Sequence, residues 1–264
     1  MAVTIPRGLY IPAIAALALL ILPIVGLISR VRWQTLPGDL FSTEALTALW
    51  LSVSTGAIAT AICLIVGAPL AVVIARSSIR TAAVLRTIVL IPLVLPPLVG
   101  GLALISLLGR SGLIGQPIFE ATGWSLPYTT AAVVVAQTFV SMPFLVITLE
   151  GAIRTSGTSH EQIASTLGAG RWRVLSRVTL PLIMPGLVGG TVLCFARAIG
   201  EFGATALFAG NSEGVTRTMP LAIYTAFNGV GVSQDSAVAL SLLLLVCAVV
   251  IVGGMRSWRE DAVR

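Results

Sequence analysis

Six long uncharged runs decide what this chain can fold into. They cover residues 8–29, 45–75, 87–109, 121–149, 178–196 and 236–255. An α-helix needs about 17–25 apolar residues to cross a bilayer, and every run meets that length. The strands of a β-barrel would be about half as long and would alternate in polarity, which these runs do not. The sequence therefore predicts an all-α integral membrane protein with six transmembrane helices.

Little of the chain remains outside these runs, so we expect one transmembrane domain over residues 1–264. Charged residues make up 10% of the chain, whereas a soluble domain averages about 25%. The first run is longer than the apolar core of a signal peptide, and no A-x-A cleavage site follows it, so we interpret it as the first span. The run over residues 45–75 is longer than a span needs, which indicates a tilted helix or an interfacial turn.

The basic residues of the chain are all arginines, and their placement predicts the orientation. With the N-terminus in the cytoplasm, eleven of the 16 fall on the inner side, four on the outer side, and Arg197 within a span. Because the inner loops of membrane proteins carry the excess of basic residues, we expect both termini to be cytoplasmic. The net charge of +6 follows from this topology and gives no reason to infer nucleic-acid binding.

The residue types exclude several chemistries. A Walker A loop needs a lysine for the β- and γ-phosphates, and the chain has none, so any ATP-driven step belongs to another subunit. We therefore expect no enzyme activity. Cys63, Cys194 and Cys247 lie in apolar runs without metal-ligand spacing, and we interpret them as buried small hydrophobic residues. We expect neither a metal nor a bound cofactor.

A polar, arginine-rich stretch over residues 150–181, which we call the coupling segment, separates the fourth run from the fifth. Thr158 and Glu161 have the spacing of a capping box, which predicts a helix start. Ile163 and Leu167 lie four residues apart and form a small apolar face. Gly168 is predicted to end the helix in the left-handed conformation. The pattern indicates a short helix, a corner and a second helix that re-enters the membrane.

Such a segment suits a rigid element on which another protein pulls. Ile163 and Leu167 would insert into a groove of the partner. Arg171 and Arg173 would pair with the partner's carboxylates. The residues alone leave open the alternative of a solvated loop that positive charge holds on the inner side.

The coupling segment resembles the cytoplasmic loop of ABC importer permeases, whose pattern is EAA-x(3)-G-x(9)-I-x-L-P. The match is carried by Gln162, Ile163, Ala164, Gly168, Val178, Leu180 and Pro181. Gln162 stands in place of the usual Glu and Ile163 in place of the first Ala, while Glu161 lies one position earlier. The resemblance implies that an ATPase subunit docks through Glu161, Gln162, Ile163, Ala164, Leu167, Gly168, Arg171 and Arg173.

Further stretches are similar to the molybdate importer permeases in particular. They are residues 92–97, 109–115, 167–174, 195–205 and 216–224, within a similarity that covers roughly residues 45–255. Sulfate permeases share the loop and a related A-R-x-x-G-E stretch, but residues 216–224 favour molybdate.

This resemblance implies a type I importer permease fold and a homodimer in the lipid of a bacterial plasma membrane. It also implies two kinds of partner. One is a dimer of ATPase subunits, which would hold the ATP and Mg. The other is a periplasmic or lipid-anchored molybdate-binding protein, which we expect to dock near Thr216, Arg217 and Thr218.

Two groups of residues are candidates for the translocation path. Pro96 and Pro97 belong to a proline-rich part of the third run, which indicates either a kinked packing helix or a segment that lines the path near its outer gate. Arg197 and Glu201 share one helix face, so they either neutralise each other or Arg197 offers positive potential to a passing dianion. Thr205 belongs to the same candidate path.

The rival class is a self-sufficient secondary carrier or channel. Such carriers typically show internal repeats and intramembrane acidic relays. The sequence shows no repeat, and one buried acid beside an arginine makes a poor relay. We therefore expect an ATP-driven permease for molybdate or for tungstate, which has the same charge and nearly the same size.

Overall fold

The computed structural model describes residues 6–229 and 234–261, and every regular element in these ranges is a helix. Four helical stretches are long and apolar enough to cross a bilayer. They are α1 (Tyr10–Ser29), the stretch Thr43–Arg76, α8 (Thr130–Ser156) and the stretch Arg171–Ile199. The predicted all-α membrane fold is therefore confirmed, whereas the count of six spans is not.

Two of these stretches join several helices without a break. Thr43–Arg76 consists of α3 (Thr43–Ile62), the π-helical turn η2 (Cys63–Gly67) and α4 (Ala68–Arg76). The second stretch consists of α10 (Arg171–Val174), the π-helical turn η3 (Leu175–Thr179) and α11 (Leu180–Ile199). The long run 45–75 is thus accommodated in one continuous helix, without an interfacial turn.

The third predicted span is not one helix. α5 (Ile79–Val94) and α6 (Pro97–Leu108) meet at an angle of 110°. Leu95 and Pro96 each precede a proline, which disfavours helical backbone, and both are extended, with ψ of 135° and 136°. The sequence predicts a kink here, but the observed bend is much sharper and sends α6 away from the direction of α5.

The sixth predicted span, residues 236–255, falls within α14 (Gln234–Asp261). The remaining helices are short, and all but η1, which precedes α1, lie between the long ones. They are η1 (Arg7–Leu9), α2 (Leu36–Leu40), α7 (Gly115–Thr122), α9 (Ser159–Thr166), α12 (Gly203–Phe208) and α13 (Met219–Phe227).

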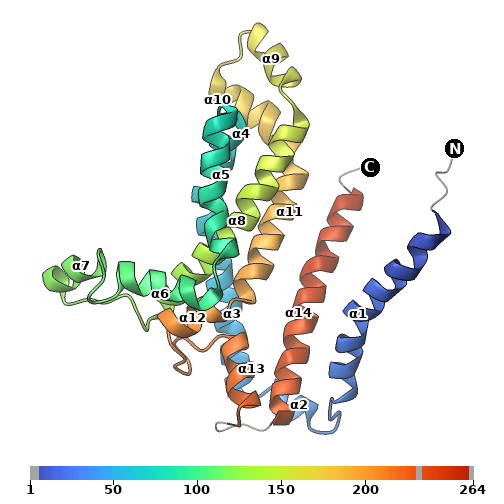
Figure 1. Ribbon diagram of the computed structural model, residues 1–264, viewed down its shortest axis with the longest axis vertical. Coiled ribbons are helices and arrows are strands. Elements are labelled where there is room, and N and C mark those ends of the chain that lie inside the picture. The colour runs from blue at the N-terminus through green and yellow to red at the C-terminus, as the bar shows by residue number, and fades with distance from the viewer. Residues whose placement is uncertain (1–5, 230–233, 262–264) are drawn as a thin grey trace.

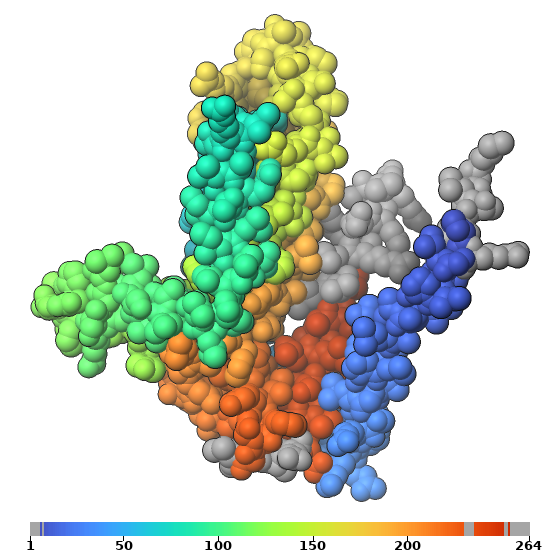
Figure 2. Space-filling model, in the orientation of Figure 1, coloured from blue at the N-terminus to red at the C-terminus, as the bar shows by residue number. Residues whose placement is uncertain are grey.

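α8 and α11 pack together at the centre of a bundle that includes α3, α4 and α5 (Figure 1). α9 forms one tip of this bundle, and α13 lies toward the opposite end. α6 and α7 project sideways as an arm, which the space-filling view also shows (Figure 2). α1 contains no buried residue, so its apolar side chains are available to lipid or to another protein chain.

The packing of α8 against α11 requires a small residue at one crossing point. A Cβ atom added at Gly186 of α11 would lie 2.3 Å from the Cβ of Ala152 on α8, whereas one added at Gly189 would have no such atom within 4 Å. We expect Gly186→Ala to destabilise the chain by about 1–3 kcal/mol through overpacking. Gly189→Ala should be neutral or stabilising, because alanine favours helix. Thermal unfolding in detergent measures both variants, and equal melting temperatures would show that the crossing has room.

Candidate functional site

The coupling segment forms the tip of the bundle around α9 and α10 (Figure 1). The chain leaves α8 through Gly157, with φ of +68°, and α9 is followed by Gly168, with φ of +82°. The Gly168 N–H donates to the Ser165 carbonyl and the Ala169 N–H donates to the Ala164 carbonyl, both at 3.0 Å. These two bonds make the Schellman ending that a left-handed glycine permits. The predicted glycine corner is confirmed.

Large apolar side chains of the coupling segment point away from the bundle. Ile163 is 59% exposed, and Leu167 and Trp172 are each 82% exposed. Exposed apolar side chains grouped at a protruding tip are typical of a surface that another protein covers. Trp172 is not among the predicted contacts, although its place between two arginines of the segment is a signal that could have pointed to it.

The other predicted coupling residues differ in exposure. Gln162, Gly168, Arg171 and Arg173 are exposed, and Ala164 is half-buried. Among the side chains that the structure describes, neither arginine has a carboxylate partner. Their guanidinium groups are therefore available to carboxylates of a partner, as the sequence predicts.

The predicted capping box does not form. Thr158 precedes α9, but its side chain accepts no hydrogen bond from a backbone N–H of the first turn; its Oγ1 atom accepts one from Gln162 Nε2 at 3.4 Å instead. Glu161 instead forms an ion pair with Arg76 at the end of α4, and its Oε1 atom accepts a hydrogen bond from Thr179 Oγ1 at 2.7 Å. An ionic partner binds a carboxylate more strongly than a neutral N–H does. Glu161 therefore faces the spans rather than the free surface of the tip.

A second ion cluster lies next to the tip, and the sequence spacing indicates only one of its pairs, Glu150 with Arg154 four residues later. Glu150 of α8 is 3% exposed, and its carboxylate accepts hydrogen bonds from Arg86 Nε of α5 at 3.1 Å and from Arg154 Nε at 2.7 Å. Arg154 also donates to the carbonyl of Ile74 on α4 at 3.3 Å. Because a lone buried carboxylate is costly, these partners hold α4, α5 and α8 together beneath the coupling segment.

Arg197 and Glu201 form the ion pair that their spacing predicts, with Arg197 Nη2 2.6 Å from Glu201 Oε2. The Glu201 side chain is 1% exposed and that of Arg197 is 28% exposed. Glu201 Oε1 also accepts a hydrogen bond from the Ala204 N–H at 2.8 Å. The glutamate therefore both neutralises the arginine and satisfies a backbone donor in the first turn of α12.

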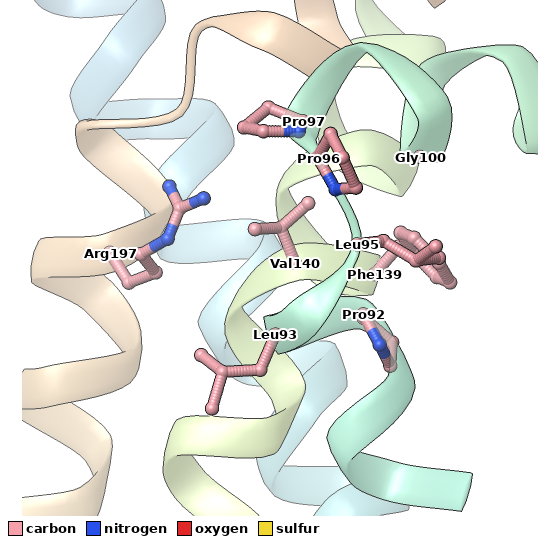
Figure 3. A pocket seen from close by; sticks show the side chains of 9 residues that line it. All are labelled: Pro92, Leu93, Leu95, Pro96, Pro97, Gly100, Phe139, Val140 and Arg197. Carbon is pink, nitrogen blue, oxygen red and sulfur yellow. The ribbon is translucent and has the colours of Figure 1, made fainter.

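Arg197 lines a cavity of about 120 Å³ beside the bend between α5 and α6. The guanidinium points from α11 toward the side of Pro97 and Val140, and Pro96 lies on the same cavity (Figure 3). The structure thus brings together three residues that the sequence assigns to the path, although they are far apart along the chain. The side chains around them, such as Phe139 and Val140, are mostly apolar.

Thr205 is not among the residues that line this cavity. It is fully buried in α12, and its Oγ1 atom has no hydrogen-bond partner among the described residues. Gln137 of α8 is also fully buried, and both polar atoms of its amide lack a partner in the same ranges. Buried polar groups are usually paired, so these two side chains stand out. Sequence reasoning missed Gln137, although an amide inside the run 121–149 is itself a signal.

The residues predicted to dock a binding protein divide into two kinds. Thr216 and Thr218 are fully buried. Thr216 Oγ1 accepts a hydrogen bond from the Ser212 N–H at 2.8 Å, so it stabilises the loop from within. The prediction that these two threonines form a docking surface is therefore wrong. Arg217 is partly exposed, and its ion pair with Glu44 at 2.8 Å joins the loop to α3.

Cysteine labelling tests both the burial and the orientation of this loop. In a Cys247→Ser background, we expect Asn211→Cys to react with a membrane-impermeant thiol reagent added outside, because Asn211 is exposed. Thr216→Cys should stay unreacted until the chain unfolds. The native Cys63 and Cys194 are buried and do not compete. Mass measurement after labelling of whole cells and of inside-out vesicles checks this, and reaction of Asn211→Cys from the inside alone would contradict the predicted orientation.

The sequence matches the family described as binding-protein-dependent transport system inner membrane component over residues 67–260. The molybdenum transport system permease protein ModB of Mycobacterium bovis is 51% identical over 251 residues, which are 95% of this chain and 94% of that protein. The protein of the same name from Escherichia coli K12 is 37% identical over 203 residues, which are 77% of this chain and 88% of that protein.

Solved ABC transporters share the fold. A chain of a bacterial alginate ABC transporter, in complex with an alginate pentasaccharide-bound periplasmic protein, has a TM-score of 0.73 at 19% identity and covers 94% of this chain and 91% of its own. A chain of the MetNI methionine ABC transporter in an inward-facing conformation has a TM-score of 0.65 at 18% identity. The match covers 84% of this chain and 97% of that one. The likeness confirms the predicted ABC importer permease fold. By sequence, the chain belongs to the family of binding-protein-dependent transport system inner membrane components.

Proposed function

We propose that the chain is the permease subunit of an ATP-driven importer that carries molybdate into the cytoplasm. The observation that carries the proposal is the 51% identity, over 95% of the chain, to a relative named for molybdenum transport. The exposed apolar face of the coupling segment supports it. Tungstate, with the same charge and nearly the same size as molybdate, belongs to the same proposal.

The proposal includes a soluble motor at the tip. Two ATPase subunits, which hold ATP and Mg, dock at the coupling segments of two permease copies. Ile163 and Leu167 enter a groove of the motor in the helix-in-groove mode, and Arg171 and Arg173 meet its carboxylates. Because the coupling segment is continuous with α8 at one end and with α11 at the other, a displacement of the tip reaches the two central helices of the bundle directly. The permease itself is not an enzyme.

In this proposal the tip and both termini lie in the cytoplasm of a bacterial cell. α1 begins and α14 ends on the side of the bundle nearer α9, which supports this arrangement (Figure 1). The opposite end, with α13, faces the periplasm, where a periplasmic or lipid-anchored binding protein delivers molybdate. A second copy of the chain completes the path, and the unburied apolar surface of α1 faces lipid or that copy.

Uptake by reconstituted vesicles tests the proposal. Vesicles with the chain and its ATPase, and with the binding protein outside, are expected to accumulate molybdate only when they contain ATP. The ATPase should copurify with the chain, and excess tungstate should compete more strongly than sulfate. Uptake without any ATPase would identify a secondary carrier instead, and equal competition by sulfate would favour a sulfate-type permease.

A further inference from the structure

α9 packs beside α10 and η3, but one side chain makes its polar contacts to the bundle. It is eight residues long, contains no buried residue, and is flanked by Gly157 and Gly168 in positive-φ conformations. The hydrogen bonds of its other described side chains stay within residues 158–166. Among the described side chains, Glu161 makes the only polar contacts between α9 and the spans. The orientation of α9 therefore depends on Glu161.

The partners of Glu161 come from two different spans. Arg76 is the last residue of the stretch Thr43–Arg76, and Thr179 closes the π-helical turn η3 of the stretch Arg171–Ile199. We call these three residues the Glu161 clamp. The Glu161 side chain is 21% exposed, that of Arg76 is 30% exposed, and Thr179 is 4% exposed. The clamp is thus shielded from solvent over most of its surface, which strengthens the ion pair relative to one in water.

Both contact points suit the transmission of movement. The end of α4 is also held by Arg154 of α8, whose guanidinium donates a hydrogen bond to the Ile74 carbonyl at 3.3 Å. A force on Arg76 therefore acts on a helix end that is already fixed to α8. η3 departs from the regular i→i−4 ladder, and π-helical turns of this kind occur frequently at functional sites. Glu161 therefore joins α9 to the fixed end of α4 and to the π-helical turn η3.

We infer that Glu161 is a positioning residue that fixes α9 against two spans, rather than a contact to the ATPase. Through the clamp, a displacement of α9 reaches the stretch Thr43–Arg76, to which the coupling segment has no covalent connection nearby. Without the clamp, the glycine corners allow α9 to turn in the groove of its partner while these spans stay in place. This inference rests on the proposed function and adds how the tip passes its movement to the bundle.

Three single variants test the inference in the assembled transporter. Glu161→Gln and Arg76→Gln break the ion pair. Arg80→Gln is the matched control, because Arg80 is exposed, follows Arg76 by four residues in the chain and has no ion pair among the described side chains. We expect both clamp variants to copurify with the ATPase as the wild type does. Molybdate uptake should fall on the order of tenfold, as for the loss of hydrogen bonds to a charged group. ATP hydrolysis should fall much less, so more ATP is consumed per molybdate, while Arg80→Gln keeps the wild-type ratio.

The exchange variant Arg76→Glu, Glu161→Arg restores an ion pair with the charges reversed, and it should recover part of the lost coupling. Three results would overturn the inference. They are an unchanged ratio of ATP to molybdate in both clamp variants, an exchange variant no better than the single ones, and loss of the ATPase from Glu161→Gln but not from Arg76→Gln. The last result would make Glu161 a contact to the ATPase.

A measurement on the chain without its ATPase separates this inference from the proposed function. A nitroxide label at Leu167→Cys, in a Cys247→Ser background, reports the mobility of α9 by electron paramagnetic resonance. The mobility should rise with Glu161→Gln and with Arg76→Gln but not with Arg80→Gln. Equal mobility in all of them would refute the clamp even in an active importer. A wild-type chain without ATP-dependent uptake would refute the proposed function and the coupling role with it.

Discussion

An Ile163→Asp, Leu167→Asp variant is expected to insert and fold like the wild type, yet to lose its ATPase and its ATP-dependent uptake. The two side chains are 59% and 82% exposed, and surface substitutions usually change stability by less than about 0.5 kcal/mol. As anchors in a groove of a partner, each should contribute about 2–4 kcal/mol to binding. The affinity for the ATPase should therefore fall by more than about 30-fold. Copurification with the ATPase and uptake into vesicles measure the loss, and thermal unfolding measures the fold.

Ile79→Asp is the control for this variant. Ile79 is 88% exposed at the start of α5, which follows closely on Arg76 in the chain. Its substitution adds one negative charge, against two in the double variant, without touching the coupling segment, so the ATPase and the uptake should be retained. Equal loss in the control would mean that negative charge near the tip, and not the apolar face, prevents docking. Full activity of the double variant would place the docking surface elsewhere.

Glu201→Met is expected to be the most damaging single substitution in the candidate path. It leaves the guanidinium of Arg197 without its partner at 2.6 Å and removes the acceptor of the Ala204 N–H. Removing one partner of a buried pair costs about 3–5 kcal/mol, and here the guanidinium left behind is 28% exposed, so the loss of the hydrogen bond from the Ala204 N–H adds to a cost at the lower end of that range. We therefore expect a large loss of assembled transporter, measured by copurification with the ATPase. Arg197→Met should also assemble poorly, because it leaves a carboxylate that is 1% exposed without its counter-ion.

The double variant Arg197→Met, Glu201→Gln separates the two roles of the pair. Both charges are absent, and the amide oxygen of glutamine still accepts the hydrogen bond from the Ala204 N–H. We expect this variant to assemble and to take up molybdate nearly as fast as the wild type, since the two side chains chiefly neutralise each other. A double variant that assembles well but transports slowly, with Arg197→Lys partly active, would show instead that Arg197 acts on the dianion from its cavity.

Features that depend on neighbouring residues in the chain follow from the sequence alone. The uncharged runs predict helices because a bilayer requires every backbone group to be satisfied within the segment. The 3.6-residue period places Arg197 and Glu201 on one face, and the structure confirms their ion pair. Gly168 has the left-handed conformation predicted for a helix end. The exposed face of Ile163 and Leu167 follows from the same period.

Three features were decided only by the tertiary structure. The prolines predict a kink, but the 110° bend also requires a place for α6 against α12, where a Cβ atom at Gly203 would lie 2.4 Å from the Cβ of Pro97. Thr216 is buried because its loop folds inward, although its polarity indicates a surface position. Glu161 binds Arg76, 85 residues away, instead of capping its own helix. In each case the neighbouring residues in the chain permit more than one conformation or hydrogen-bond partner. The residue that the fold brings near, from a distant part of the chain, determines which arrangement has the lowest free energy.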